Sequence, residues 1–257
     1  MALGAVLAVA GNTVREAVRN RVLSILLAFA IVMIGAAIAL ANLSYVEQTR
    51  ILQNLAFAAM RLSGTVIAIA VGINLIHREV DRRTVYTVLS KPVSRGAFLL
   101  GKYLGLVVTL WLIVGIMFAA FAVVSLLGRA SVGAGHVAAT GLIATELALV
   151  VALATLFSSF TTPMLAALFT TGIVASGHLT RDLLVLGAQS GEPSLAAAAR
   201  ILYGVLPDLE SFNLTLHAVH RLPITASDVA LATVYGAGYT VLLLFLAAAI
   251  FSRRDFR

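Results

Sequence analysis

Most of the chain consists of long apolar runs, each about the length of a membrane-crossing helix. Of the 257 residues, 61% are hydrophobic and only 11% are charged. A soluble domain carries about 25% charged residues, whereas about 20 consecutive apolar residues cross a bilayer as a helix. The runs are continuous and do not alternate between apolar and polar positions, which excludes a membrane β-barrel. We therefore expect one all-α, polytopic membrane domain over residues 1–257.

Six stretches have the length and hydropathy expected of transmembrane helices, near residues 22–41, 55–76, 103–127, 137–160, 164–180 and 229–251. Residues 1–21 place apolar side chains at helical spacing and gather Arg15, Glu16 and Arg19 near the end. This pattern favours an amphipathic elbow helix at the membrane interface, with an extension of the first span as the alternative. No charged residue precedes Arg15, so the start of the chain does not resemble a secretory signal peptide.

The basic residues are distributed unequally between the two sides of the membrane. Six spans place both termini on one side, and that side holds twelve of the 18 Lys and Arg residues: Arg15, Arg19, Arg21, Arg78, Arg82, Arg83, Lys91, Arg95, Lys102, Arg253, Arg254 and Arg257. The positive-inside rule assigns the richer side to the cytoplasm. The formal charge of +7 then follows from topology, and we expect no nucleic-acid partner because no basic face is interleaved with aromatic residues.

The polar segment His77–Lys102, between the second and third expected spans, has the pattern of a short amphipathic helix. Thr84 can cap this helix and Pro92 stops it. The apolar stripe of the helix consists of Val85, Val88 and Leu89, with Arg82 and Arg83 beside it. A small apolar patch rimmed by arginine suits docking into a groove on a partner protein. The alternative is an ordinary cytosolic loop whose arginines bind anionic lipid.

Several motifs resemble those of ABC-2-type ABC transporter permeases. The run from Glu79 through Thr84–Leu89 to Arg95, followed by Leu99–Lys102, is similar to the first cytoplasmic loop of that family, which carries its coupling helix. Residues 15–19 (REAVR) are similar to the elbow helix, and residues 206–213 (LPDLESFN) and 251–256 (FSRRDF) to the segment before the last span and to the tail. The last two features resemble the branch for multicopper-enzyme maturation, including the nitrous oxide reductase assembly type.

The resemblance implies an export permease of the bacterial inner membrane, with cytoplasmic termini, that forms a homodimer and binds two copies of a cytosolic ABC ATPase. The implied ATPase-coupling residues are Glu79, Arg82, Arg83, Thr84, Val85, Val88, Leu89 and Arg95. The chain contains no G-x-x-x-x-G-K-[ST] loop, so we expect it to be no enzyme by itself, with ATP and Mg²⁺ bound by the ATPase and no cofactor bound here. Membrane lipid and a periplasmic accessory protein are further expected partners.

Glu146 lies in the middle of the fourth expected span. A charge at the bilayer centre costs about 3 kcal/mol or more, so such residues usually face a cavity or a partner. We expect Glu146 either to line the translocation path or to be protonated and hydrogen-bonded to a threonine on a neighbouring span. It would also be the ion site if the protein were a self-sufficient channel or secondary carrier, although no clear repeat relates residues 1–128 to 129–257.

The stretch from Arg181 to Thr225 is too long for a bare loop and too broken for a span. Pro193 favours a helix through 195–205, and Pro207 stops it. We expect this piece to form an outer gate, with a passive lid as the alternative. The expected gate residues are Leu206, Pro207, Asp208 and Phe212.

His217 and His220 have a spacing that can bind a metal, but we interpret them as interfacial histidines and expect no metal site. The chain has no cysteine to serve as a metal ligand.

Overall fold

The computed structural model describes residues 2–19, 24, 27–28, 31–32, 34–36, 47–81, 95–127 and 130–253. All the regular structure in these residues is helical, as the sequence predicts. The helices are α1 (Ala2–Val18), α3 (Gln48–Asp81), α5 (Arg95–Leu127), α6 (Ala134–Ser158), α7 (Pro163–His178), α8 (Thr180–Gln189), α9 (Pro193–Val205), the 3-10 turn η1 (Leu209–Phe212), α10 (Thr215–Val219) and α11 (Ala226–Arg253).

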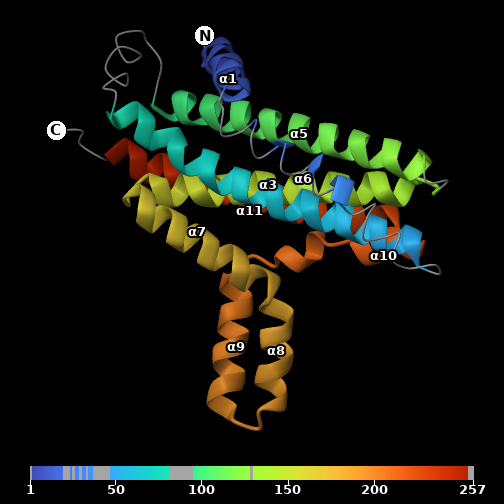
Figure 1. The fold of residues 1–257 in the computed structure, drawn as a ribbon. Coiled ribbons are helices and arrows are strands. Elements are labelled where there is room, and N and C mark those ends of the chain that lie inside the picture. Colours follow the sequence, from blue (N-terminus) through green and yellow to red (C-terminus); the bar gives the residue numbers. More distant parts are fainter. Residues whose placement is uncertain are drawn as a thin grey trace.

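Four long helices, α3, α5, α6 and α11, run side by side and form the body of the molecule (Figure 1). Each is long and apolar enough to cross a membrane, over residues 48–73, 96–127, 134–158 and 226–251. Helix α6 contacts the other three and has the most buried surface of the four. Its inner residues are mostly Ala, Leu, Val and Thr. The small ones among them let neighbouring helices approach closely, as is common in membrane bundles.

Hydrogen bonds between neighbouring helices add to this packing. The hydroxyl of Tyr103 on α5 donates to the carbonyl oxygen of Ala148 on α6 at 3.1 Å. The hydroxyl of Ser158 on α6 donates to the carbonyl oxygen of Ile73 on α3 at 2.9 Å. In hydrocarbon these hydroxyls have no water to bond with, so backbone carbonyls of adjacent helices satisfy them.

Helix α1 crosses α5 near the N-terminal end of α5 (Figure 1). The two backbones touch at Gly105, where an added Cβ would lie 2.6 Å from the carbonyl oxygen of Ala10. An ion pair of 3.2 Å joins Glu16 to Lys102 beside this contact. Leu3 and Leu7 remain exposed on the other side of α1. Residues Ala2–Val18 of the expected elbow 1–21 are helical, and their role as an elbow at the membrane interface stays a prediction.

The fifth expected span, over 164–180, is not one straight helix. Helix α7 has 16 residues and is followed by α8 after a bend of 60°. At 1.5 Å per residue α7 alone is about 24 Å long, shorter than a hydrocarbon core of about 30 Å. Only the bent pair together has the length and composition of a span. The bend follows Gly177, where the carbonyl oxygen of Pro207 lies 2.8 Å from an added Cβ and a larger residue would collide with it.

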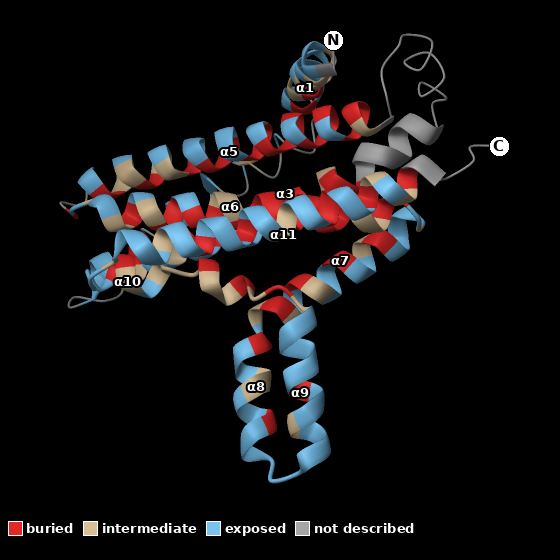
Figure 2. Ribbon diagram, turned by 180° about the vertical axis from the view of Figure 1, so that it is seen from behind, coloured by how far each residue is buried: buried red, intermediate tan, exposed pale blue. Residues whose placement is uncertain are grey.

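Helices α8 and α9 form a hairpin that projects sideways from the bundle, and most of its residues are exposed (Figure 2). The helix predicted through 195–205 is present as α9, which begins at Pro193 and ends before Pro207. The first expected span, 22–41, lies largely outside the described residues. The described part of the chain therefore contains four candidate spans, or five with the bent pair, and the count of six stays a prediction.

A buried charge cluster

Glu146 lies in the middle of α6 with its side chain fully buried. Its Oε2 lies 3.3 Å from Nε of Arg61 on α3, and its Oε1 lies 3.2 Å from Nε2 of His178 at the end of α7. Among the described residues no hydroxyl donates to this carboxylate, so the threonine partner considered from the sequence is replaced by two basic side chains. These contacts compensate the large cost of removing the carboxylate from water.

His178 extends the cluster toward the surface. Its Nε2 faces Glu146, and its Nδ1 lies 3.8 Å from Oε2 of Glu210 in η1. Its two ring nitrogens therefore face two different carboxylates, one fully buried and one at the surface. Side-chain exposure rises from 0% for Glu146 through 26% for His178 to 37% for Glu210, and Arg61, on the other side of Glu146, is 17% exposed. The four side chains are called the charge cluster below.

The charge cluster attaches residues 206–213, the segment between α9 and α10, to the bundle. Nη2 of Arg61 donates to the carbonyl oxygen of Phe212 at 3.4 Å. The amide of Asn213 donates to Oε1 of Glu210 at 2.7 Å, which orients that carboxylate. The segment therefore contacts both the buried arginine and the exposed carboxylate of the cluster.

Two further sets of contacts hold the same segment. Nε of Arg181 on α8 donates to Oδ2 of Asp208 at 2.9 Å, and Oδ1 of Asp208 accepts from the N–H of Ser211, which starts η1. The N–H of Asp208 donates to the hydroxyl of Tyr235 on α11 at 2.9 Å. Asp208 thus links the hairpin, the 3-10 turn and the last long helix.

Phe212 is the apolar anchor of the segment. Its ring is fully buried and lies over Gly236 of α11, where an added Cβ would be 2.9 Å from the ring. The ring also packs against Tyr235, with ring centroids 6.2 Å apart. A glycine at position 236 therefore provides the space that Phe212 occupies.

The structure describes all of the predicted elbow residues but only two of the predicted coupling residues. Arg15, Glu16 and Arg19 are exposed on or just after α1, and Glu16 pairs with Lys102. Of the expected coupling residues, Glu79 lies in α3 and Arg95 begins α5. The remaining ones, Arg82, Arg83, Thr84, Val85, Val88 and Leu89, fall outside the described residues. Within the described ranges no group of three His, Asp or Glu side chains could hold a metal ion, so His217 and His220 have no third ligand there.

Sequence reasoning placed Glu146 inside a span but missed its partners. The hydropathy pattern alone does not connect Arg61 or His178 with Glu146. The sequence does contain a signal for the contact between Arg61 and Glu146. The two residues have opposite charges and lie within two different apolar runs, and charges inside membrane spans usually pair. No comparable signal identifies His178, because its position depends on the bend after α7.

Two comparisons with known proteins extend these observations. Residues 7–256 match the sequence model of a family described as ABC-2 family transporter protein. A comparison with curated proteins gives no match.

Proposed function

The chain belongs to the ABC-2 transporter family, and we propose that it is an export permease of the bacterial inner membrane, driven by a separate cytosolic ATPase. The family makes the chain a membrane component of an ABC transporter, with the ATPase in a partner subunit. The match over residues 7–256 is the observation that carries the proposal. The absence of a phosphate-binding G-x-x-x-x-G-K-[ST] loop from the sequence supports the same division of labour.

We further propose that two copies of the chain bind two ATPase subunits, which hold ATP and Mg²⁺. In this proposal the ATPases contact the short helix over Thr84–Ser90, and their closure moves the helices on either side of it. Arg82, Arg83 and Glu79 supply charge at the contact, and Val85, Val88 and Leu89 supply its apolar centre. Arg95 begins the helix that returns into the bundle. The amphipathic pattern of the segment supports this assignment.

Exchange of one residue in this helix tests the coupling. The chain is co-purified with the ABC ATPase encoded beside it, and ATP hydrolysis is measured with and without the permease. Arg83→Glu or Val88→Asp should reduce co-purification and abolish any effect of the permease on hydrolysis, because each places an acidic group in the contact. Arg200→Gln, on exposed α9, is the control. Unchanged co-purification and turnover in both variants would exclude this contact.

The charge cluster supports a role for residues 206–213 as the outer gate. In the proposal Leu206, Pro207, Asp208 and Phe212 close the outer mouth, and release of the segment from Arg61 and His178 opens it. Glu146 then lines the path once its partners separate. A self-sufficient carrier that uses Glu146 as its ion site receives less support, because both carboxylate oxygens already face basic side chains.

Copper-enzyme maturation is the narrowest form of the proposal, with a periplasmic accessory protein as a further partner. It is supported by the resemblance of residues 206–213 and 251–256 to that branch. Deletion of the gene should then lower the copper content of the host's multicopper enzymes, as measured by metal analysis of the purified enzymes. An unchanged copper content would exclude this branch and leave the permease role standing.

A further inference from the structure

A polar pocket opens at the end of the bundle where α3 and α6 begin, away from the charge cluster. It has a volume of about 390 Å³, within the range of about 300–1,000 Å³ found for small-molecule sites. Three parts of the chain form it: the start of α3, the connection between α5 and α6, and the turn after α10. The lining residues are Glu47, Thr49, Arg50, Gln53, Ala130, Ser131, Val219, His220 and Arg221.

Arg221 is the main cation of this pocket. Its φ of +54° places a non-glycine residue in the left-handed region, which costs free energy and often marks a functional position. The guanidinium donates to the hydroxyl of Ser131, and within the described residues it has no carboxylate within ion-pair distance. Residues 37–46, which precede the pocket in the sequence, contain no acidic residue.

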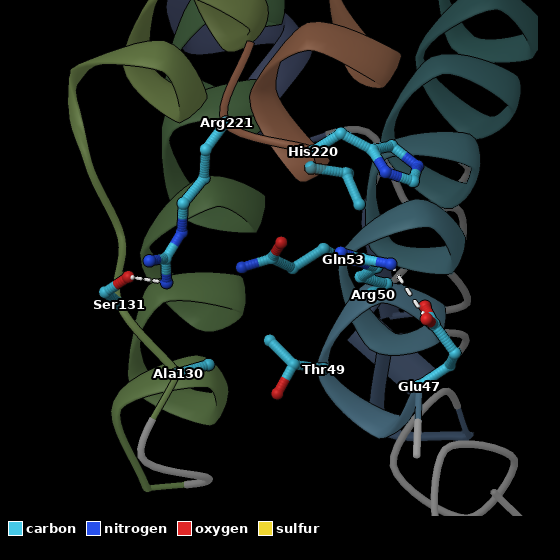
Figure 3. A pocket seen from close by; sticks show the side chains of 9 residues that line it. Glu47, Thr49, Arg50, Gln53, Ala130, Ser131, His220 and Arg221 are labelled. Atoms are coloured by element: carbon cyan, nitrogen blue, oxygen red, sulfur yellow. Dashed lines mark hydrogen bonds and ion pairs between the residues drawn. The ribbon is translucent and has the colours of Figure 1, made fainter.

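Gln53 is a buried polar group without a partner. The residue is 3% exposed, and in the described part of the chain no hydrogen bond reaches its amide. Figure 3 shows the amide directed into the space beside the guanidinium of Arg221. An amide both donates and accepts hydrogen bonds, so a ligand inside the pocket could bond to it.

The charges of the other lining residues identify the kind of ligand. Glu47 is the acidic residue of the lining, and its Oε1 pairs with Nη1 of Arg50 at 2.8 Å. Among the described residues this leaves Arg221 without a carboxylate partner, and the Gln53 amide is directed toward its guanidinium (Figure 3). A guanidinium with neutral donors around it binds phosphate-type oxyanions well, because the guanidinium presents two parallel N–H groups. A metal cation would meet an excess of positive charge.

A second cavity of about 360 Å³ shares Ser131 and Arg221 with the first and continues along Ala218, Leu222 and Ile224. Arg221 therefore lies next to a lining that contains these apolar residues together with His136 and His217. We propose that the pocket around Arg221 and Gln53 binds a phosphate-type oxyanion, either free phosphate or the phosphodiester of an anionic lipid headgroup. This site is separate from the ATPase contact and the gate, and it does not depend on them.

The test uses the full chain purified in detergent with its ATPase and no nucleotide. Inorganic phosphate is titrated by calorimetry, and retention of phosphatidylglycerol is measured by native mass spectrometry. Arg221→Gln removes the cation, and Gln53→Glu places a negative charge in the pocket with almost the same shape. Arg200→Gln on α9, exposed and outside the pocket, is the matched control for the loss of one positive charge.

We expect each pocket variant to weaken binding about tenfold or more, since a hydrogen bond to a charged group contributes about 1.5–3 kcal/mol, and the control to bind like the wild type. Phosphate binding with this sensitivity supports a site for free phosphate. Retention of phosphatidylglycerol alone, with the same sensitivity, supports a lipid headgroup. Binding of neither probe to the wild type, or binding unchanged in Arg221→Gln, overturns the proposal. Because Arg221 is exposed, that variant is informative even if Gln53→Glu fails to fold.

Discussion

Glu146 is stabilised by residues that its own helix does not supply. Arg61 reaches it from α3 and His178 from the end of α7. The attraction between the charges is strong in a low-dielectric interior, but it is offset by the cost of removing each group from water. The intact pair is therefore a weak source of stability, whereas loss of one partner leaves an uncompensated buried charge. This asymmetry makes a single exchange at position 146 informative.

We predict that Glu146→Gln destabilises the folded protein by about 3–5 kcal/mol, because Arg61 keeps its charge in a mostly buried position without a counter-ion. The free energy of unfolding is measured by denaturant titration in detergent. Glu192→Gln, in the exposed turn between α8 and α9, should change it by no more than about 0.5 kcal/mol. Adding Arg61→Met to Glu146→Gln should recover part of the loss. Equal stability of Glu146→Gln and the wild type would show that the ion pair is absent.

At the scale of single elements, local sequence signals predict some boundaries well. Pro193 and Pro207 delimit α9 because proline is tolerated in the first turn of a helix and stops a helix further along. The sequence predicts the fifth span as one helix because its hydropathy is continuous up to Gly177. At the bend, Gly177 packs against the carbonyl of Pro207, 30 residues later in the sequence. Hydropathy contains no information about such a contact.

The charge cluster shows the same limit. The sequence predicts a buried carboxylate in α6 because Glu146 lies inside a long apolar run. Arg61 and His178 contact this carboxylate and Glu210 contacts His178, so the cluster joins positions up to 149 residues apart. These contacts depend on how α3, α7 and η1 pack against α6. The amphipathic pattern of Thr84–Ser90 predicts the coupling helix. These residues lie outside the part of the chain that the structure describes.

The contact of Phe212 with Gly236 gives a test of how residues 206–213 are held. We predict that Gly236→Leu displaces the Phe212 ring, because an added Cβ would already lie 2.9 Å from it. Amide hydrogen exchange at residues 208–213 should become about tenfold faster or more, in line with the cost of overpacking of about 1–3 kcal/mol. Gly238→Leu, on the same helix with open space around it, should leave the exchange unchanged. Similar exchange in the two variants would show that Phe212 does not anchor the segment.

At the scale of the whole molecule, the two ends of the bundle have different expected roles. One end holds the end of α3, the start of α5 and the turn between α6 and α7. The other end holds the polar pocket and the starts of α6 and α11 (Figure 1). The proposed mechanism requires the first end to face the cytoplasm, since ATP is there. The positive-inside rule supports this orientation from charge alone.

Single cysteines at the two ends of α6 test the orientation directly, because the chain has no cysteine of its own. Ala134, at the start of α6, and Thr162, just before α7, are both exposed. We predict that a membrane-impermeant maleimide labels Ala134→Cys but not Thr162→Cys in spheroplasts, and labels both after permeabilisation. The second condition controls for the reactivity of each thiol. Labelling of Thr162→Cys alone in intact spheroplasts would place residues 77–102 outside the cell. No cytosolic ATPase could then bind the Thr84–Ser90 helix, and the proposed coupling would be wrong.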